Sequence, residues 1–380
     1  MQIKRLAYKR LEELAQPGVV VIVYGPRRVG KTTILEMLSA TWPAEKVIKF
    51  SGDSVVDRER LEFNDQRHLQ NVIGDAKYVL IDEAQRIPNI GLSLKLIVDY
   101  LPDRVVVVSG SATFELAKQA EEPLTGRKRT LILYPISYAE IVTFKDKVEA
   151  RVLLERWLIW GQYPTAITIE NEKDRRLWLE ELINGYLYKD MLDLAGIKHA
   201  GKVVDLLRLL AYQIGQEVSV SELGQNLDMA KETVAHYLDL LQQNFVLFNV
   251  RGLARNLRKE VSKNSRYYFW DNGVRNALIN NFNGLKLRND TGQLWENFLA
   301  VERLKRMANR GESANYYFWR TYDQKEIDWV EEEGGKFEGS EFKFSGGAIR
   351  KSVSETFLAT YPGSRLRVIN RENFEDYLLV

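Results

Sequence analysis

The sequence contains no cysteine and only three histidines among its 380 residues. Disulfide bonds and thiolate metal sites are therefore excluded, and any bound metal must rest mainly on carboxylates. The apolar runs, such as VVVIV at 19–23, have the length of strands and are far too short to cross a bilayer. The first residues, MQIKRLAYKR, lack the apolar core of a signal peptide. We therefore expect a soluble cytoplasmic protein that does not bind a membrane.

The length of the chain favours two to four domains. Hydrophobic residues make up 45% and charged residues 28% of the chain, as is typical of soluble globular proteins. The formal net charge is only +2, so the overall charge says little about partners and the local distribution must carry that argument.

The hydrophobic pattern changes several times along the chain. Up to about residue 135, buried strand-like runs alternate with helix-length segments, which predicts a parallel α/β sheet and places a first domain at 1–136. Residues 137–196 are expected to form a helical lid. Three helical stretches and a strand-like run follow, and their tight helix-turn-helix spacing predicts a winged-helix domain at 197–275. A long helix and several strands then predict an α/β domain at 276–380.

A phosphate-binding loop is predicted at 25–32, where GPRRVGKT satisfies the pattern G-x-x-x-x-G-K-[ST] between a buried strand and a helix. Backbone N–H groups of such a loop wrap phosphates, and the helix N-terminus adds positive potential. Lys31 is expected to reach the β- and γ-phosphates and the Thr32 hydroxyl to ligate Mg²⁺, so ATP and Mg²⁺ are the expected cofactors. The alternative is a chance glycine turn. The predicted nucleotide-binding residues are Gly25, Arg28, Gly30, Lys31, Thr32, Thr33 and Asp82.

An acidic pair follows the apolar run YVLI at 78–81. Asp82 is expected to hold Mg²⁺ through water, and Glu83 to polarise the attacking water as general base. A pair of acids that caps a strand end is the alternative, and the Asp-Glu order favours a hydrolase over a kinase. A further strand, VVVVSGS at 105–111, ends in small polar residues. Ser109 or Ser111 is a candidate sensor of the γ-phosphate, with a plain turn as the alternative.

These segments together resemble the AAA-type P-loop ATPases of bacteria and archaea that carry a C-terminal domain of unknown function. The resemblance runs through GPRRVGKTT, VLIDEAQRIPN, VSGSATF and LTGRKRTLILYPISYAE, over about 25–141. It implies an arginine finger at the Gly-Arg before the L-x-P-[IL]-S strand, which makes Arg127 the candidate. Such a guanidinium neutralises charge on the transferring phosphoryl group, often from a neighbouring subunit, so a homo-oligomer is expected. The alternative is a solvated basic turn, because Lys128 and Arg129 follow directly.

The predicted winged helix is followed by a basic segment with a single acid, Glu260. Such a strip can follow a phosphate backbone without reading sequence, which favours DNA as a partner. A solvated loop, or a basic surface that docks on another subunit, is the alternative. The predicted DNA-binding residues are Arg251, Arg255, Arg258, Lys259, Lys263 and Arg266.

The C-terminal part contains a glutamate on a helix, an aspartate on a strand and a Glu-x-Lys pair on the next strand, in that order. This order resembles the pattern of the PD-(D/E)XK nuclease fold. Members of the ATPase family named above also resemble that fold in their last domain. Adjacent strands can bring Asp328, Glu341 and Lys343 to one end of a sheet, where two carboxylates bind Mg²⁺ or Mn²⁺ and the lysine steadies the attacking water. Glu296 from the packed helix would complete the metal ligands. The alternative is a vestigial nuclease fold used for docking or oligomer contacts.

Two functions therefore remain open from the sequence. The first is an ATP-hydrolysing DNA-processing protein that binds branched or Holliday-junction-like DNA and cleaves it with its C-terminal domain. The second is a regulatory ATPase switch whose degenerate nuclease fold binds protein or DNA. Both functions require Lys31 and Asp82. Only the first requires Glu341 and Lys343 to act in DNA cleavage.

Overall fold

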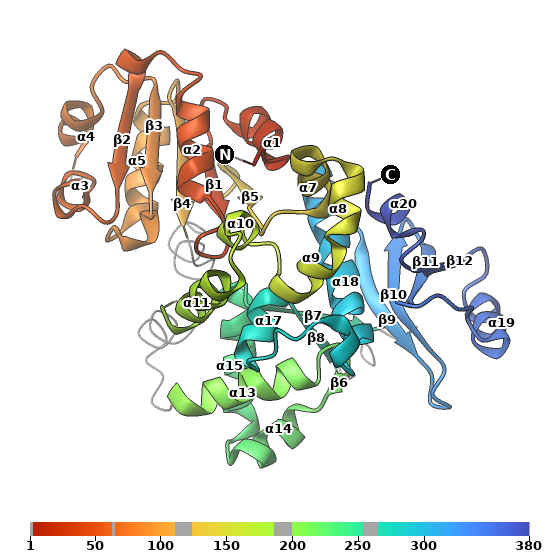
Figure 1. Cartoon of the computed structure of the whole chain (residues 1–380). Helices are drawn as coiled ribbons and strands as arrows, with labels where there is room; N and C mark the ends of the chain where they lie inside the picture. Colours follow the sequence, from red (N-terminus) through yellow and green to blue (C-terminus); the bar gives the residue numbers. More distant parts are fainter. Residues whose placement is uncertain (1–2, 63–64, 111–123, 186–199, 254–264, 380) are drawn as a thin grey trace. The chain divides into compact units, whose positions relative to one another are not determined.

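The structure, a computed structural model, describes residues 3–62, 65–110, 124–185, 200–253 and 265–379 (Figure 1). The chain forms two compact units. Unit 1 comprises Met1–Ile136 with Gln243–Phe245, and unit 2 comprises Ser137–Gln242 with Val246–Val380. Within the described ranges, no helix combines the length and the apolar character that a membrane span requires.

Unit 1 is built around a five-stranded sheet in the order β2-β3-β4-β1-β5. Every pair in this sheet is parallel, as the alternation of strand-like and helical segments predicted. All residues of the two central strands β1 and β4 are buried, because helices cover a parallel sheet on both faces. The strands are β1 (Val20–Tyr24), β2 (Val47–Ser51), β3 (Tyr78–Asp82), β4 (Val105–Gly110) and β5 (Lys128–Ile132), and the helices are α1 (Ala7–Leu14), α2 (Lys31–Ser39), α3 (Val55–Arg60), α4 (Gln66–Ile73) and α5 (Ile90–Tyr100).

Unit 2 begins with helices and continues into a mixed sheet. Its first helices are α7 (Tyr138–Lys145), α8 (Lys147–Val152), α9 (Leu154–Trp160), α10 (Pro164–Thr168) and α11 (Glu172–Leu182). The elements of the predicted winged helix follow as α13 (Ala200–Tyr212), β6 (Glu217–Val218), α14 (Val220–Leu227), α15 (Lys231–Gln243), β7 (Leu247–Gly252) and β8 (Ser265–Phe269). Asp228 adopts a left-handed conformation with φ 49° and ends α14, so it does not cap α15.

The C-terminal part of unit 2 has the element order that the sequence predicted, a helix, three strands, a helix and a strand. These elements are α18 (Thr291–Arg310), β9 (Asn315–Arg320), β10 (Glu326–Glu333), β11 (Lys336–Phe342), α19 (Lys351–Thr360) and β12 (Arg365–Ile369), with α17 (Asn272–Leu278) before them and α20 (Phe374–Leu379) after them.

One seven-stranded sheet crosses the predicted boundary between residues 275 and 276. Its order is β12-β11-β10-β9-β7-β8-β6, and the join is the parallel pairing of β7 with β9, in which Arg251 lies opposite Tyr317. The winged-helix strands and the C-terminal strands therefore form a single sheet in unit 2.

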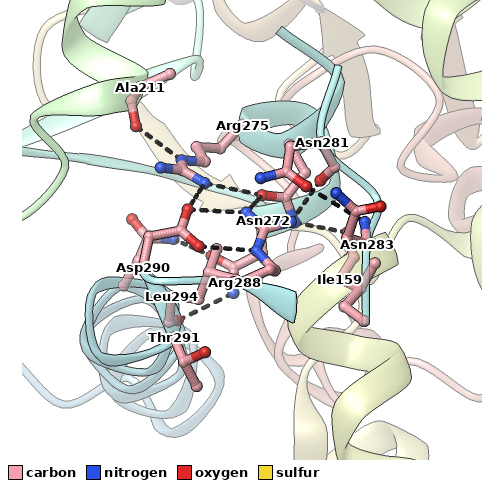
Figure 2. Close-up of polar contacts among 12 residues, drawn as sticks. Ile159, Ala211, Asn272, Arg275, Asn281, Asn283, Arg288, Asp290, Thr291 and Leu294 are labelled. Carbon is pink, nitrogen blue, oxygen red and sulfur yellow. Dashed lines mark hydrogen bonds and ion pairs between the residues drawn. The ribbon is translucent and has the colours of Figure 1, made fainter. Parts of the chain in front are cut away.

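A buried polar network fixes the start of α18, the helix that carries Glu296 (Figure 2). Arg288 donates to both oxygens of Asp290, at 2.8 Å each, and Arg275 donates to the same carboxylate. Arg275 also donates to the Ala211 carbonyl of α13 at 2.8 Å, and Asn272 donates to the Leu294 carbonyl of α18 at 3.0 Å. Burial alone would raise the pKa of Asp290, but the hydrogen bonds from Arg288 and the charge of Arg275 outweigh it and lower that pKa to about 2.

Candidate functional sites

The loop between β1 and α2 has the backbone of a phosphate cradle. Gly25 and Gly30 adopt φ values of 153° and 95°, and Arg28 adopts 60°, so the loop needs residues that tolerate positive φ. At Gly25 a side chain is also excluded sterically, because a Cβ atom there would lie 2.1 Å from the Leu133 carbonyl oxygen. The Arg28 and Thr33 side chains are exposed on either side of the loop.

Lys31 lies inside this loop and is only 5% exposed. Its Nζ donates to the carbonyl oxygens of Gly25 at 2.9 Å and Pro26 at 2.8 Å. Burial lowers the pKa of Lys31 to about 8, despite the opposing charges of Glu83 and Asp82. A phosphate in the cradle would supply the negative charge that the two neutral carbonyls do not.

Three of the predicted side chains meet beside the loop. Thr32 Oγ1 donates to Asp82 Oδ2 at 2.6 Å, and Ser109 Oγ donates to Asp82 Oδ1. Hydroxyl and carboxylate oxygens are ligands that Mg²⁺ accepts, and this ion usually takes its remaining ligands from water and substrate phosphates. The Thr32–Asp82 pair therefore fits Mg²⁺, which when bound neutralises charge on the phosphates.

Glu83 lies next to this cluster in an unusual conformation. Its φ is 49°, in the left-handed region, and its N–H points to Asp82 Oδ1 at 3.1 Å and Ser109 Oγ at 3.3 Å. Gln85 Nε2 donates to Glu83 Oε2 at 2.6 Å and so holds the carboxylate in place. Glu83 thus lies beside Asp82 and Ser109, and its role as general base stays a prediction. Ser111, the other predicted sensor, lies outside the described residues.

Arg127 lies at the opposite edge of the same sheet. Its carbonyl accepts from the N–H of Val20 at 2.8 Å, so it sits beside the start of β1, whereas the phosphate loop follows the end of that strand. The five residues of β1 separate the two positions by about 16 Å. The Arg127 guanidinium forms an ion pair with Asp99 at the end of α5. A finger role for Arg127 at the phosphates of its own chain is incompatible with this position.

Arg5 belongs to the phosphate site although the sequence analysis did not select it. It is 8% exposed and donates to the carbonyls of Val29, in the loop, at 2.7 Å and of Tyr134, after β5, at 2.6 Å. The only signal in the sequence was a basic residue within a short amphipathic helix, which ordinarily indicates a solvated face.

The predicted C-terminal residues converge on one pocket of about 810 Å³ within unit 2. Glu296, Asp328 and Lys343 line it, and Glu341 forms an ion pair with Lys343 at 2.7 Å. Burial, followed by the charges of Glu296 and Glu341, raises the pKa of Asp328 well above its usual value. The sequence therefore located these side chains in one place, although their role stays a prediction.

An arginine occupies the centre of this carboxylate cluster. Arg266 is 4% exposed, and its guanidinium lies 2.8 Å from Glu326, 3.5 Å from Glu296 and 3.7 Å from Asp328. Tyr268 from the same strand donates to Glu296 at 2.7 Å. The prediction that Arg266 lies on an exposed DNA-binding strip is wrong, because its side chain is buried among acids.

The residues of this pocket do not fit the predicted Mg²⁺ or Mn²⁺. Throughout the described ranges, no three acidic or histidine side chains are placed so that they could share a metal ion. The Arg266 guanidinium, which is hydrogen-bonded to Glu296 and lies 3.7 Å from Asp328, supplies donors only and repels a second cation.

The other predicted DNA-binding residues are divided by the limits of the described structure. Arg251 is exposed on β7. Arg255, Arg258, Lys259 and Lys263 lie outside the described residues, so their role remains a prediction.

Comparison with known families assigns three segments of the chain. Residues 18–142 match the AAA domain family, residues 151–285 match a domain of unknown function (DUF8612), and residues 291–376 match a domain of unknown function (DUF4143). The match of residues 18–142 supports an AAA-type P-loop ATPase domain with ATPase activity. The C-terminal match agrees with the domain of unknown function that the sequence resemblance implied.

Curated relatives are uncharacterized proteins of several microorganisms. A protein of Mycobacterium tuberculosis is 28% identical over 90% of this chain and 74% of its own length. One of Haemophilus influenzae is 23% identical over 85% and 82%, and one of Methanocaldococcus jannaschii is 21% identical over 83% and 72%. Among solved structures, a chain in the structure of Drosophila ORC bound to DNA aligns with a TM-score of 0.26 and 12% identity, over 73% of this chain and 95% of that chain. This score is too low to support a functional conclusion.

Proposed function

We propose that this chain is an ATP-hydrolysing protein that acts on DNA, with unit 1 as the motor and unit 2 as the DNA-binding part. Branched forms such as Holliday-junction-like DNA are the proposed substrates, because backbone-and-shape recognition suits them. DNA recombination or repair is the process this substrate implies.

The observation that carries ATP hydrolysis is the contact of Thr32 and Ser109 with the two oxygens of Asp82, beside the Lys31 loop. Lys31 would bind the β- and γ-phosphates, and Thr32 with Asp82 would hold Mg²⁺. Glu83 would orient and deprotonate the attacking water, and Ser109 would sense the γ-phosphate through its bond to Asp82.

The position of Arg127 supports an oligomer. Because Arg127 lies at the sheet edge away from the phosphates of its own chain, it would act as a finger only in a second copy. In that assembly its guanidinium would leave Asp99 and neutralise charge on the transferring phosphoryl group of the neighbour.

DNA binding rests on the middle part of unit 2. The order α13-β6-α14-α15-β7-β8 is typical of a winged helix, and the basic residues between β7 and β8 are where the wing would be. The exposed residues of α15 include Lys231 and Glu232, so a mixed charge rather than base reading is expected there.

Cleavage of the bound DNA by the C-terminal pocket is a further candidate activity. The convergence of Glu296, Asp328, Glu341 and Lys343 favours it. The guanidinium of Arg266 within that cluster favours the alternative, a regulatory switch in which a degenerate nuclease fold serves as a binding module for DNA or protein.

One set of assays tests these proposals separately. ATP turnover is measured for the wild type, Lys31→Ala and Glu341→Ala. Gel retardation and cleavage of labelled duplex, forked and four-way DNA are measured with Mg²⁺ or Mn²⁺, with and without ATP. The DNA-binding variant replaces Arg255, Arg258, Lys259 and Lys263 by Glu, and its control replaces the exposed Lys336 and Lys351 by Glu.

We expect ATP turnover to be lost only in Lys31→Ala, and DNA retardation only in the four-residue variant, with a strong dependence on salt. Full ATP turnover by Lys31→Ala would overturn the phosphate site. Equal retardation by the four-residue variant and the wild type would overturn the DNA site and leave the ATP site standing. Metal-dependent cutting that Glu341→Ala abolishes would establish the nuclease.

A further inference from the structure

Arg266 is held in the carboxylate cluster by the fold itself. It belongs to β8, where its backbone pairs with Val250 of β7 and Glu217 of β6. Its guanidinium lies 4.6 Å from the centre of the Phe318 ring, which is 1% exposed. Strand pairing and ring stacking thus direct this side chain into the pocket rather than to solvent.

The carboxylates around Arg266 come from elements that are distant in sequence. Glu296 is on α18, whereas Glu326 and Asp328 are on β10. Buried carboxylates are tolerated only when a positive charge and hydrogen bonds compensate them. Arg266 provides both to Glu296 and a positive charge to Asp328, and Lys343 provides both to Glu341.

We propose that the Arg266 guanidinium takes the place of a divalent cation in this cluster, so that unit 2 folds and keeps its pocket without metal. The other cationic side chains of the pocket also form ion pairs with carboxylates. Arg320 pairs with Glu217 at 2.9 Å, and Lys343 pairs with Glu341 at 2.7 Å. The inference concerns unit 2 alone and does not depend on ATP hydrolysis by unit 1.

A latent cation site follows from this arrangement. Removal of the guanidinium leaves Glu296 and Asp328 beside the space it filled, and two carboxylates with water as the remaining ligands are enough for such an ion. Carboxylates so placed are the ligands of Mn²⁺ and Mg²⁺. Arg266→Ala should therefore convert a metal-independent cluster into a metal-dependent one.

The experiment measures the thermal midpoint of the full chain in EDTA and in MnCl₂ for the wild type, Arg266→Ala, Arg266→Gln and Arg303→Ala. Arg303 is the matched control, because it is also mostly buried but pairs with a single carboxylate, Glu331, at 2.6 Å. A second comparison, Arg266→Ala with and without Glu296→Gln and Asp328→Asn, separates this site from any metal held at the ATP site. ATP turnover reports that unit 1 is intact.

We expect saturating Mn²⁺ to raise the midpoint of Arg266→Ala by about 5 °C or more and to leave the wild type and Arg303→Ala unchanged. Glu296→Gln with Asp328→Asn should abolish that rise. Mn²⁺ stabilisation of the wild type that the same two substitutions remove would overturn the proposal. So would the failure of both Arg266 variants to respond to Mn²⁺, whether they are folded or not in EDTA.

Discussion

The phosphate site of unit 1 and the carboxylate cluster of unit 2 each contain one buried cation near acidic side chains, but the two cations have different partners. Lys31 donates to the neutral carbonyls of Gly25 and Pro26, whereas Arg266 lies against three carboxylates. A carboxylate attracts a cation through its full negative charge, whereas a carbonyl offers only a dipole. Lys31 can therefore exchange its carbonyl partners for a ligand, whereas Arg266 already has carboxylate partners.

Removal of Arg266, the buried cation of unit 2, is expected to have the largest effect. Arg266→Ala leaves buried carboxylates uncompensated and should lower the free energy of unfolding of unit 2 by about 3–5 kcal/mol. Seven of the eight tryptophans lie in unit 2, so tryptophan fluorescence during chemical denaturation reports on it. The exposed Arg251→Ala is the control and should change the free energy by less than about 0.5 kcal/mol. Equal losses of stability in Arg266→Ala and Arg251→Ala would contradict a structural role for Arg266 and so remove the difference from Lys31.

Removal of the unit 1 cation should affect function rather than stability. Lys31→Ala is expected to lower kcat/KM for ATP hydrolysis by about 10²–10³-fold, because it removes the positive charge that Lys31 would place at the β- and γ-phosphates. Its unfolding midpoint should change little, since the lost bonds are to carbonyls that water can reach once the side chain is gone. Lys49→Ala, an exposed lysine on β2, is the matched control. A large loss of stability in Lys31→Ala would mean that this cation is structural as well.

Arg5 tests whether the shape of the unit 1 loop matters as well as its charge. Arg5→Ala removes the bonds to Val29 and Tyr134, and we expect KM for ATP to rise about tenfold while kcat changes less. Arg5→Lys should recover part of the affinity, and Arg10→Ala, an exposed arginine on α1, should have no effect. The three variants are compared by steady-state ATP hydrolysis, and unchanged KM in Arg5→Ala would contradict the positioning role.

The smallest effect is expected at the network that fixes α18. The pKa of Asp290 is lowered to about 2 in the folded chain, below the usual carboxyl value. Its contribution, about 1–2 kcal/mol, is therefore present above about pH 4 and is lost as the pH falls toward 2. Denaturation of Asp290→Asn and wild type between pH 2 and 7 should show the difference shrinking in acid. The exposed Asp376→Asn is the control and should change the free energy of unfolding by less than about 0.5 kcal/mol.

The sequence indicated which unit 1 side chains come together, because each lies at the end of a strand or at the start of the helix that follows one. Lys31 and Thr32 follow one strand, Asp82 and Ser109 end two others, and carboxyl ends of parallel strands meet at one sheet edge. The same reasoning places Arg127 at the far edge, since it precedes β5 rather than following it.

The sequence could not reveal the role of Arg266. It stands near the end of a basic run, and its direction depends on the register of β8 with β7 and β6 and on the pairing of β7 with β9. Those pairings join residues far apart in the chain, and a shift of one residue would turn Arg266 to the other face. The sequence indicated the carboxylates because each lies in a recognisable helix or strand. It did not indicate that Arg266 is the cation among them.

The pairing of β7 with β9 has a consequence for synthesis on the ribosome. The sheet of unit 1 can close once β5 has emerged, but β7 must wait for α17 and α18 before its partner strand appears. Until then one edge of β7 exposes unpaired backbone groups, which are templates for other chains. Chains that terminate between β8 and β9 should therefore aggregate through β7 instead of accumulating as a free ATPase domain, so nascent chains of this protein would need a chaperone at that stage.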